Sequence, residues 1–180
     1  KSVAWFLSLI STILCLVVSI LLIRLVGEGS SITYYLGGWS PPIGIEYRID
    51  WANSILLFLI SVISFIVMLF SKSALKEEIP EEKHTLFYAC FLLCLTGLLG
   101  VVATADIFNV FVFLEISSLS TYVLVAQGVY VDKRALSSAF NYLIMGTIGA
   151  TFFVIGIGFI YMATGSLNMG DIAERVVDLG

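Results

Sequence analysis

Five long apolar stretches constrain the fold of this 180-residue chain more than any other feature. Segments of about 18 apolar residues or more cross a bilayer as α-helices, because lipid offers the backbone no hydrogen bonds. The composition agrees, since 59% of the residues are hydrophobic and 12% are charged, whereas about 25% are charged in an ordinary soluble domain. We therefore expect an all-α membrane protein with about five transmembrane helices in a single membrane domain, residues 1–180. The predicted spans are 3–26, 51–71, 86–105, 107–129 and 135–163.

Two shorter segments complete the predicted fold. Residues 32–50 contain two alternating segments around Gly-Gly-Trp-Ser-Pro-Pro, a pattern typical of a β-hairpin with a longer loop. We expect this extramembrane β-hairpin between the first two spans, either as an interfacial plug without chemistry or as a contact for a partner subunit. Residues 167–179 predict a C-terminal amphipathic helix along the membrane, with apolar residues on one face. These are Leu167, Ile172, Val176 and Leu179.

The positive charges predict how the chain is oriented, because cytoplasmic loops carry an excess of Lys and Arg. With five spans, Lys1, Lys72, Lys76, Lys83, Lys133 and Arg134 fall on one side, and Arg24, Arg48 and Arg175 on the other. We therefore expect loops 71–85 and 130–134 in the cytoplasm, and 24–50 and 164–180 outside, in a prokaryotic plasma membrane. The formal net charge of −4 gives no argument for a nucleic-acid partner.

Glu115 is the candidate for chemistry, because it is the only formally charged residue in 107–131. Glu115 lies about 12 Å along the predicted helix, near the middle of the membrane. A charge at that depth costs at least ~2.5 to 3.5 kcal/mol. Burial disfavours the charged form and a nearby cation favours it, so such a carboxyl can gain and lose a proton. Ser118 and Tyr122 follow on the same helical face and add hydroxyls to a predicted proton pathway. The alternative is a static carboxylate paired across helices.

Three other polar residues, Asp106, His84 and Asn141, are weaker candidates. Asp106 is expected to cap the fourth helix rather than admit ions, and His84 to be solvated rather than a proton relay. Asn141 and Gln127 are polar residues at depth, and Asn141 is expected to pack or to bond across helices. No metal site, cofactor site or catalytic group is predicted, since the three cysteines all fall within spans, where Cys is a common packing residue.

Small residues are frequent in the fifth span. Gly146 and Ala150 form a small-xxx-small pair, and Gly149, Gly156 and Gly158 add further thin points. Because small residues allow helix backbones to approach closely in lipid, we expect this helix to pack tightly on its neighbours.

Several segments together resemble a known family. They are Asp106-Ile-Phe-Asn-Val-Phe-Val-Phe-Leu-Glu115, Ser120-Thr-Tyr-Val-Leu124, Phe140-Asn-Tyr-Leu-Ile-Met-Gly146, Ala163-Thr-Gly-Ser-Leu-Asn-Met-Gly-Asp171 and Leu36-Gly-Gly-Trp-Ser-Pro-Pro42. The chain is similar to the antiporter-like subunits shared by respiratory complex I, energy-converting membrane hydrogenases and Mrp-type sodium/proton antiporters. It looks most like the D-type subunit of the Mrp antiporters, and the resemblance covers nearly the whole chain.

The resemblance implies an architecture of about fourteen helices built from two inverted repeats, the repeat logic of many transporters. This chain resembles family helices two to six, so we expect a part of a longer subunit or one of a split pair. Glu115 falls on the family's key membrane glutamate, whose usual partner is a Lys on the following broken helix. Members often carry Lys where this chain has Asn141, which argues against a charged relay at that point.

The sequence therefore predicts a segment of a proton-translocating subunit in a cation/proton antiporter or a redox-driven ion pump. Expected partners are other integral membrane subunits of a large complex, lipid, protons and, in an antiporter, sodium. The rival interpretation is a structural assembly module without its own ion path, in which Glu115 is only an interhelical hydrogen-bond partner. A membrane-embedded enzyme is a weaker third interpretation, because no nucleophile-base pair or phosphate-binding loop is present.

Overall fold

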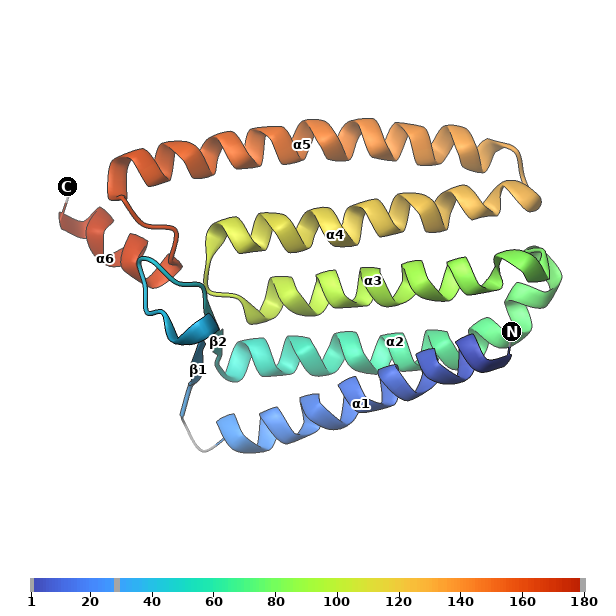
Figure 1. Cartoon of the computed structure of the whole chain (residues 1–180), viewed down its shortest axis with the longest axis horizontal. Helices are drawn as coiled ribbons and strands as arrows, with labels where there is room; N and C mark the ends of the chain where they lie inside the picture. The colour runs from blue at the N-terminus through green and yellow to red at the C-terminus, as the bar shows by residue number, and fades with distance from the viewer. Residues whose placement is uncertain (1, 28–29, 179–180) are drawn as a thin grey trace.

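The structure, a computed structural model, describes residues 2–27 and 30–178. Within this part of the chain, five helices are long and apolar enough to cross a membrane, which confirms the predicted membrane fold. They are α1 (Ser2–Val26), α2 (Trp51–Glu78), α3 (His84–Ala103), α4 (Ile107–Ala126) and α5 (Arg134–Thr164). Successive helices run in opposite directions, so that their connections gather at two opposite ends of the array (Figure 1). We call these the hairpin end, with residues 30–50, 104–106 and 165–178, and the loop end, with residues 79–83 and 127–133.

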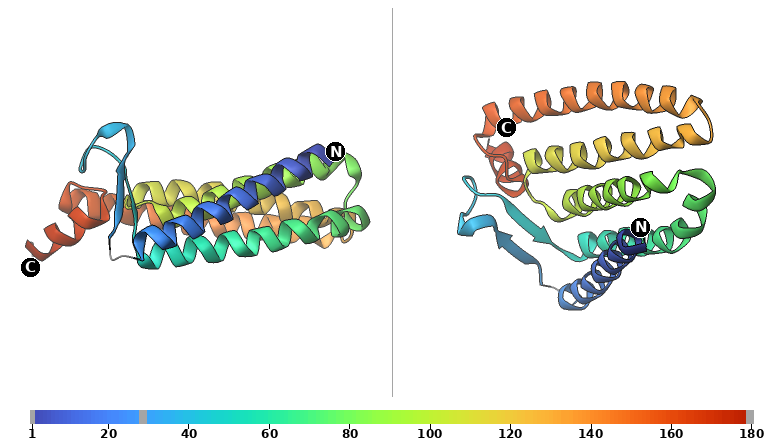
Figure 2. Two further views of the ribbon diagram at one scale, coloured as in Figure 1. Left: turned by 90° about the horizontal axis from the view of Figure 1, so that it is seen from below. Right: turned by 45° about the vertical axis from the view of Figure 1, so that its right-hand side comes forward.

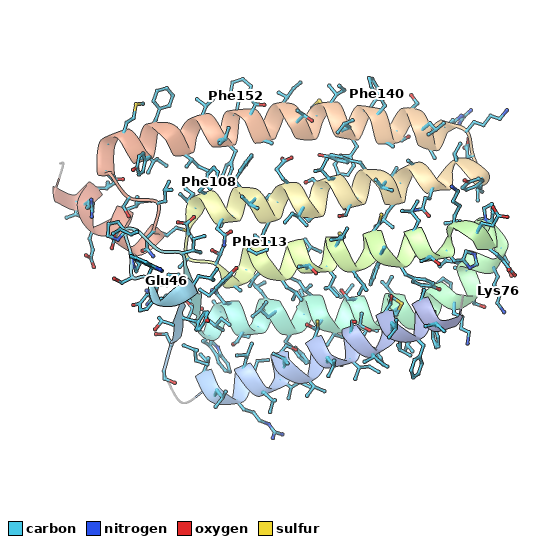
Figure 3. All side chains as sticks on the ribbon, viewed as in Figure 1. Glu46, Lys76, Phe108, Phe113, Phe140 and Phe152 are labelled. Carbon is cyan, nitrogen blue, oxygen red and sulfur yellow. The ribbon has the colours of Figure 1, made fainter. Side chains whose placement is uncertain are left out.

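Each long helix packs against the next one in the chain, and α1 crosses α2 obliquely (Figures 1 and 2). Such a layer leaves broad apolar faces uncovered. Phe140 and Phe152 point away from α4 on the outer side of α5 (Figure 3), and 61% and 71% of their surfaces are exposed. These faces are suited to lipid or to other membrane helices.

The close approach of α3 and α4 depends on glycine. A Cβ atom built on Gly97 would lie 2.7 Å from both the Phe113 carbonyl oxygen and the Ser117 Cβ, and one on Gly100 would collide with the Phe113 ring. The two helices are joined by a short turn, residues 104–106, so they are antiparallel neighbours. On α1 and α2, which also pack together, small hydroxyl residues such as Ser8 and Ser61 are buried and leave room for close contact.

Helix α2 continues past the apolar stretch that ends near residue 71. It continues to Glu78, because the buried face recurs at helical spacing through Met68, Ser71 and Leu75. Leu75 packs with Met68, Ile79 and Tyr88 in the main cluster of buried apolar residues at the loop end. Much of the polar segment that precedes α3 is therefore helical, and a short 3₁₀ helix (Glu81–Lys83) follows it.

The predicted hairpin is present at the end of α1. Strands β1 (Ile32–Tyr35) and β2 (Glu46–Ile49) pair antiparallel, with Ile32 opposite Ile49, and a 3₁₀ turn (Leu36–Gly38) begins the loop between them. Asp50 directly follows β2 and caps α2, since its Oδ1 accepts the Asn53 N–H at 2.9 Å.

The hairpin end is held together by hydrogen bonds between segments far apart in sequence. The Ala105 N–H donates to the Glu46 carbonyl at 2.9 Å, the Ile107 N–H to the Leu167 carbonyl at 2.9 Å, and the Met169 N–H to the Ala105 carbonyl at 2.9 Å. The hairpin, the α3–α4 turn and the segment after α5 thus form one polar junction. This junction positions the start of α4, and with it the residues that α4 carries.

Helix α6 (Met169–Asp178) follows this junction and corresponds to the predicted amphipathic helix. Of the apolar residues expected on one face, Ile172 is half-buried, whereas Val176 is 53% exposed and Leu167 precedes the helix. Leu179 lies outside the described residues. The apolar side of α6 is therefore only partly covered by the described bundle.

Candidate functional site

Glu115 lies near the middle of α4 and is half-buried. It lines a groove of about 270 Å³ between α4 and α5. The groove residues from α4 are Phe111, Leu114, Glu115 and Ser118, and those from α5 are Gly146, Gly149, Ala150 and Phe153. The α5 wall is thus made largely of residues with little or no side chain, which leaves space opposite the carboxylate.

The polar groups of α4 divide into two sets. Ser117, Ser120 and Thr121 donate to carbonyls of their own helix at 2.7 to 2.9 Å, those of Leu114, Ile116 and Ser117. Ser117 also lies against Gly97 of α3, and the Thr121 hydroxyl lies 3.4 Å from the Cys94 sulfur. The hydroxyl hydrogens of all three therefore have an acceptor within α4 itself.

The other set faces α5 and has free hydrogen-bonding capacity. Within the described part of the chain, the side chains of Glu115 and Ser118 make no hydrogen bond, and Glu115 has no ion-pair partner. The Tyr122 hydroxyl lies against Gly146, and its ring makes an edge-to-face contact with Tyr142. The structure therefore brings all three predicted pathway residues to the α4–α5 interface, the carboxylate and hydroxyls lying along one stripe.

The weaker candidates lie elsewhere. Asp106 is buried at the hairpin end, where its Oδ1 accepts the Asn109 N–H at 2.7 Å, so the predicted cap of α4 is confirmed. Burial raises the pKa of the Asp106 carboxyl, and hydrogen bonds from the Asn109 and Phe108 N–H groups partly oppose this rise. Asn141 is exposed on α5 and does not line the groove.

His84 is at the loop end, on the opposite side of the bundle from Asp106. Its Nε2 lies 2.9 Å from the Ile79 carbonyl and 3.1 Å from the Leu75 carbonyl, so with a proton on this nitrogen the ring caps the last turn of α2. The side chain is half-buried rather than freely solvated. Sequence reasoning missed this role, because the carbonyls belong to the preceding helix and no motif marks them.

Gln127 is buried, and its side-chain amide is unsatisfied among the described residues. It is 6% exposed, and neither its Nε2 nor its Oε1 has a hydrogen-bond partner among the described residues. An unsatisfied buried amide of this kind costs about 1 to 3 kcal/mol.

Three other features of the described residues offer no carboxylate, amine or metal-binding cluster. A larger groove of about 450 Å³ lies between α1, α2, α3 and the hairpin, and its lining contains no carboxylate or amine. No group of three or more His, Cys, Asp or Glu side chains gathers as a metal site would require in residues 2–27 and 30–178. Of the glycines within α5, only at Gly146 would an added Cβ atom meet a neighbouring helix, whereas at Gly149, Gly156 and Gly158 it would face open space in the described structure.

Comparison with protein families places residues 104–178 in a family described as NADH:quinone oxidoreductase/Mrp antiporter, transmembrane region. This segment contains α4, α5 and α6, and so includes the groove. The N-type subunit of NADH-quinone oxidoreductase from Desulforudis audaxviator is 44% identical over 146 residues, which cover 81% of this chain and 28% of that protein. The D-type subunit of the Na⁺/H⁺ antiporter from Bacillus subtilis is 31% identical over 165 residues, which cover 92% of this chain and 32% of that protein.

Solved structures contain the same fold. A chain of the membrane-bound sulfane sulfur reductase, an archaeal respiratory membrane complex, superimposes with a TM-score of 0.89 and 35% identity, over 100% of this chain and 36% of that one. A chain of the Mrp complex from Dietzia sp. DQ12-45-1b superimposes with a TM-score of 0.80 over 98% of this chain and 34% of that one. At 20% identity, the second match speaks for the fold alone. This chain spans about a third of the length of these relatives, with shares from 28% to 36%.

Proposed function

We propose that this chain is a proton-translocating segment in which Glu115 takes up and releases protons. The chain belongs to the superfamily of antiporter-like membrane subunits and spans one part of the length of such a subunit. The relatives are named for NADH-quinone oxidoreduction and for Na⁺/H⁺ antiport. The segment then works with other membrane subunits, and either a sodium gradient or redox chemistry elsewhere in the complex drives it. The loop end faces the cytoplasm in this proposal, as the distribution of Lys and Arg predicts.

The observation that carries the proposal is the free carboxylate in the α4–α5 groove. Glu115 is the only formally charged residue from Ile107 to the end of α4, and no cation pairs with it among the described residues. A carboxylate held at such a depth needs a partner, water or a proton. A purely structural hydrogen bond would instead be expected to show a partner on α3 or α5.

The two hydroxyls extend the path along α4. Ser118 and Tyr122 follow Glu115 by three and seven residues, which corresponds to rises of about 4.5 and 10.5 Å along the helix axis. Hydroxyl groups both donate and accept, so each can pass a proton on while receiving another. No hydrogen bond joins these side chains directly among the described residues, so in this proposal water molecules bridge the steps.

Replacing Glu115 by Gln in the intact complex tests the proposal. The E115Q variant keeps the shape of the side chain but removes the titrating group, so proton-coupled transport in proteoliposomes is expected to fall by at least about a hundredfold. E115D keeps a carboxyl and is expected to retain part of the activity. Ser117→Ala is the matched control, because that hydroxyl bonds to its own helix on the α3 side. Normal assembly and unchanged transport in E115Q would instead support the structural assembly module.

A further inference from the structure

Tyr122 lies just beyond the groove that Glu115 lines, toward the loop end. Among the residues that line the groove, Ser118 on α4 and Gly146 on α5 lie nearest the loop end of the bundle. Tyr122 lies one turn beyond Ser118 on α4 and is buried, with 8% of its surface exposed. Its phenol hydroxyl reaches across to the backbone of α5, so it stands between the groove and the loop end.

Gly146 provides the space for this hydroxyl. A Cβ atom built on Gly146 would collide with the Tyr122 oxygen and would lie 2.9 Å from the ring carbon that carries it. The three atoms nearest to that position all belong to the Tyr122 side chain. The missing side chain at Gly146 is therefore matched to one group, the Tyr122 hydroxyl. Gly149, Gly156 and Gly158 on the same helix show no comparable contact.

Tyr142 fixes the orientation of the Tyr122 ring. The two ring centroids are 4.9 Å apart and the planes meet at 81°, an edge-to-face contact between α4 and α5. Such pairs contribute about 0.5 to 1.5 kcal/mol beyond their buried area. Tyr142 is one helical turn before Gly146, so both contacts come from one stripe of α5. The hydroxyl of Tyr142 is not needed for this contact, because a phenylalanine ring presents the same edge and face.

We infer that Gly146 and Tyr142 are positioning residues that hold the Tyr122 hydroxyl at the loop end of the Glu115 groove, where it relays protons between Glu115 and the loop side. This inference rests on the proposed function and adds to it a route toward the loop end and two positioning residues. In each passage the phenol O–H bond breaks as its proton passes to a groove water molecule, which in turn hands a proton to the Glu115 carboxylate. A new O–H bond forms as a hydrated proton (H₃O⁺) on the loop side gives its proton to the phenol oxygen and becomes neutral water, so the tyrosine returns to its starting state.

The test separates the hydroxyl from the ring at the two tyrosines. Proton flux is measured in proteoliposomes that contain the intact complex, with assembly checked by native electrophoresis. Y122F keeps the ring but loses the relay oxygen, so its flux is expected to fall about tenfold, less than the ~10²–10⁴-fold of a full proton-transfer group because water can substitute. Y142L should slow the flux to a similar extent, whereas Y142F should keep the wild-type rate. Equal rates in Y142F and Y142L would overturn the positioning role of the Tyr142 ring.

Gly146 is tested with a control on the same helix. G146A is expected to slow the flux about tenfold, and G156A to leave it unchanged, because Gly156 faces open space in the described structure. If G146A prevents assembly, the double variant with Y122L decides. Leucine lacks both the colliding oxygen and the ring carbon at 2.9 Å, so assembly should return, and continued failure would refute the positioning role of Gly146.

The outcomes also separate this inference from the proposed function. Wild-type flux in E115Q contradicts the proposed function itself. Lost flux in E115Q, together with wild-type flux in Y122F and in G146A, contradicts only the relay at Tyr122. Slow flux in E115Q, Y122F, Y142L and G146A, with normal flux in Y142F and G156A, supports both.

Discussion

Asn168 is predicted to hold the hairpin end together, because its side chain bonds both to strand β2 and to helix α6. Its Nδ2 donates to Glu46 Oε2 at 2.7 Å, and its Oδ1 accepts the Gly170 and Asp171 N–H groups at 2.9 and 3.1 Å. The side chain is 5% exposed. It thus links strand β2 to the first turn of α6, across 122 residues of sequence.

The expected loss in Asn168→Ala follows from these contacts. Removing an N-cap side chain costs typically ~1 kcal/mol. A hydrogen bond to a charged group contributes about 1.5 to 3 kcal/mol, and we take about 1 kcal/mol here because Glu46 is only half-buried and solvent screens it. The sum of about 2 kcal/mol corresponds to roughly a 30-fold larger population of the locally open state.

Hydrogen exchange measured by mass spectrometry in the intact complex checks this prediction. Amides of α6's first turn, and the Met169 and Ala105 amides at the junction, should exchange about 30-fold faster in N168A. Glu46→Gln is the matched control, since its amide oxygen still accepts from Asn168, and its exchange should rise by less than about threefold. Unchanged exchange in N168A would show that Asn168 does not hold the junction together.

Two further predictions concern buried polar groups. Burial raises the folded-state pKa of Asp106, so the folded state binds the proton more tightly than the unfolded state, and this contribution to stability is present at low pH and lost as pH rises above the ordinary value of about 3.9. Thermal unfolding should therefore show the stability of wild type relative to D106N falling as pH rises through that acid range, and a flat or rising difference would contradict the burial argument. Gln127→Met removes two unsatisfied polar atoms, so the Tm should rise, by an amount equivalent to about 1 to 3 kcal/mol. A lower Tm would mean that the Gln127 amide is bonded in the assembled complex.

The sequence predicts the parts of the fold that local periodicity determines. Apolar runs longer than a bilayer core predict the five helices, and the short turn before Ile107 predicts that α3 and α4 are antiparallel neighbours. Asp106 is predictable as a cap because an N-cap bonds to its own helix three residues on. Helical spacing also predicts that Glu115, Ser118 and Tyr122 share a face.

Spacing alone does not say which neighbour that face meets or which hydroxyls are already bonded. Ser117 and Ser118 are adjacent and chemically identical, yet the Ser117 hydroxyl donates to its own helix and the Ser118 hydroxyl makes no hydrogen bond among the described residues. Contacts between distant segments are hidden for the same reason. The Asn168–Glu46 bond and the contact of Tyr122 with Gly146 each depend on how whole elements pack, not on a local pattern.

Glu115 is proposed to change its protonation state within the membrane, and infrared difference spectroscopy observes such a change at the carboxyl itself. Spectra of the intact complex are recorded across the pH range in which it transports ions, for wild type and for E115Q. We expect a carboxylic acid C=O band that appears and disappears with pH in wild type and is absent from E115Q. A Glu115 carboxyl that keeps one protonation state throughout that range would contradict the proposed proton uptake and release.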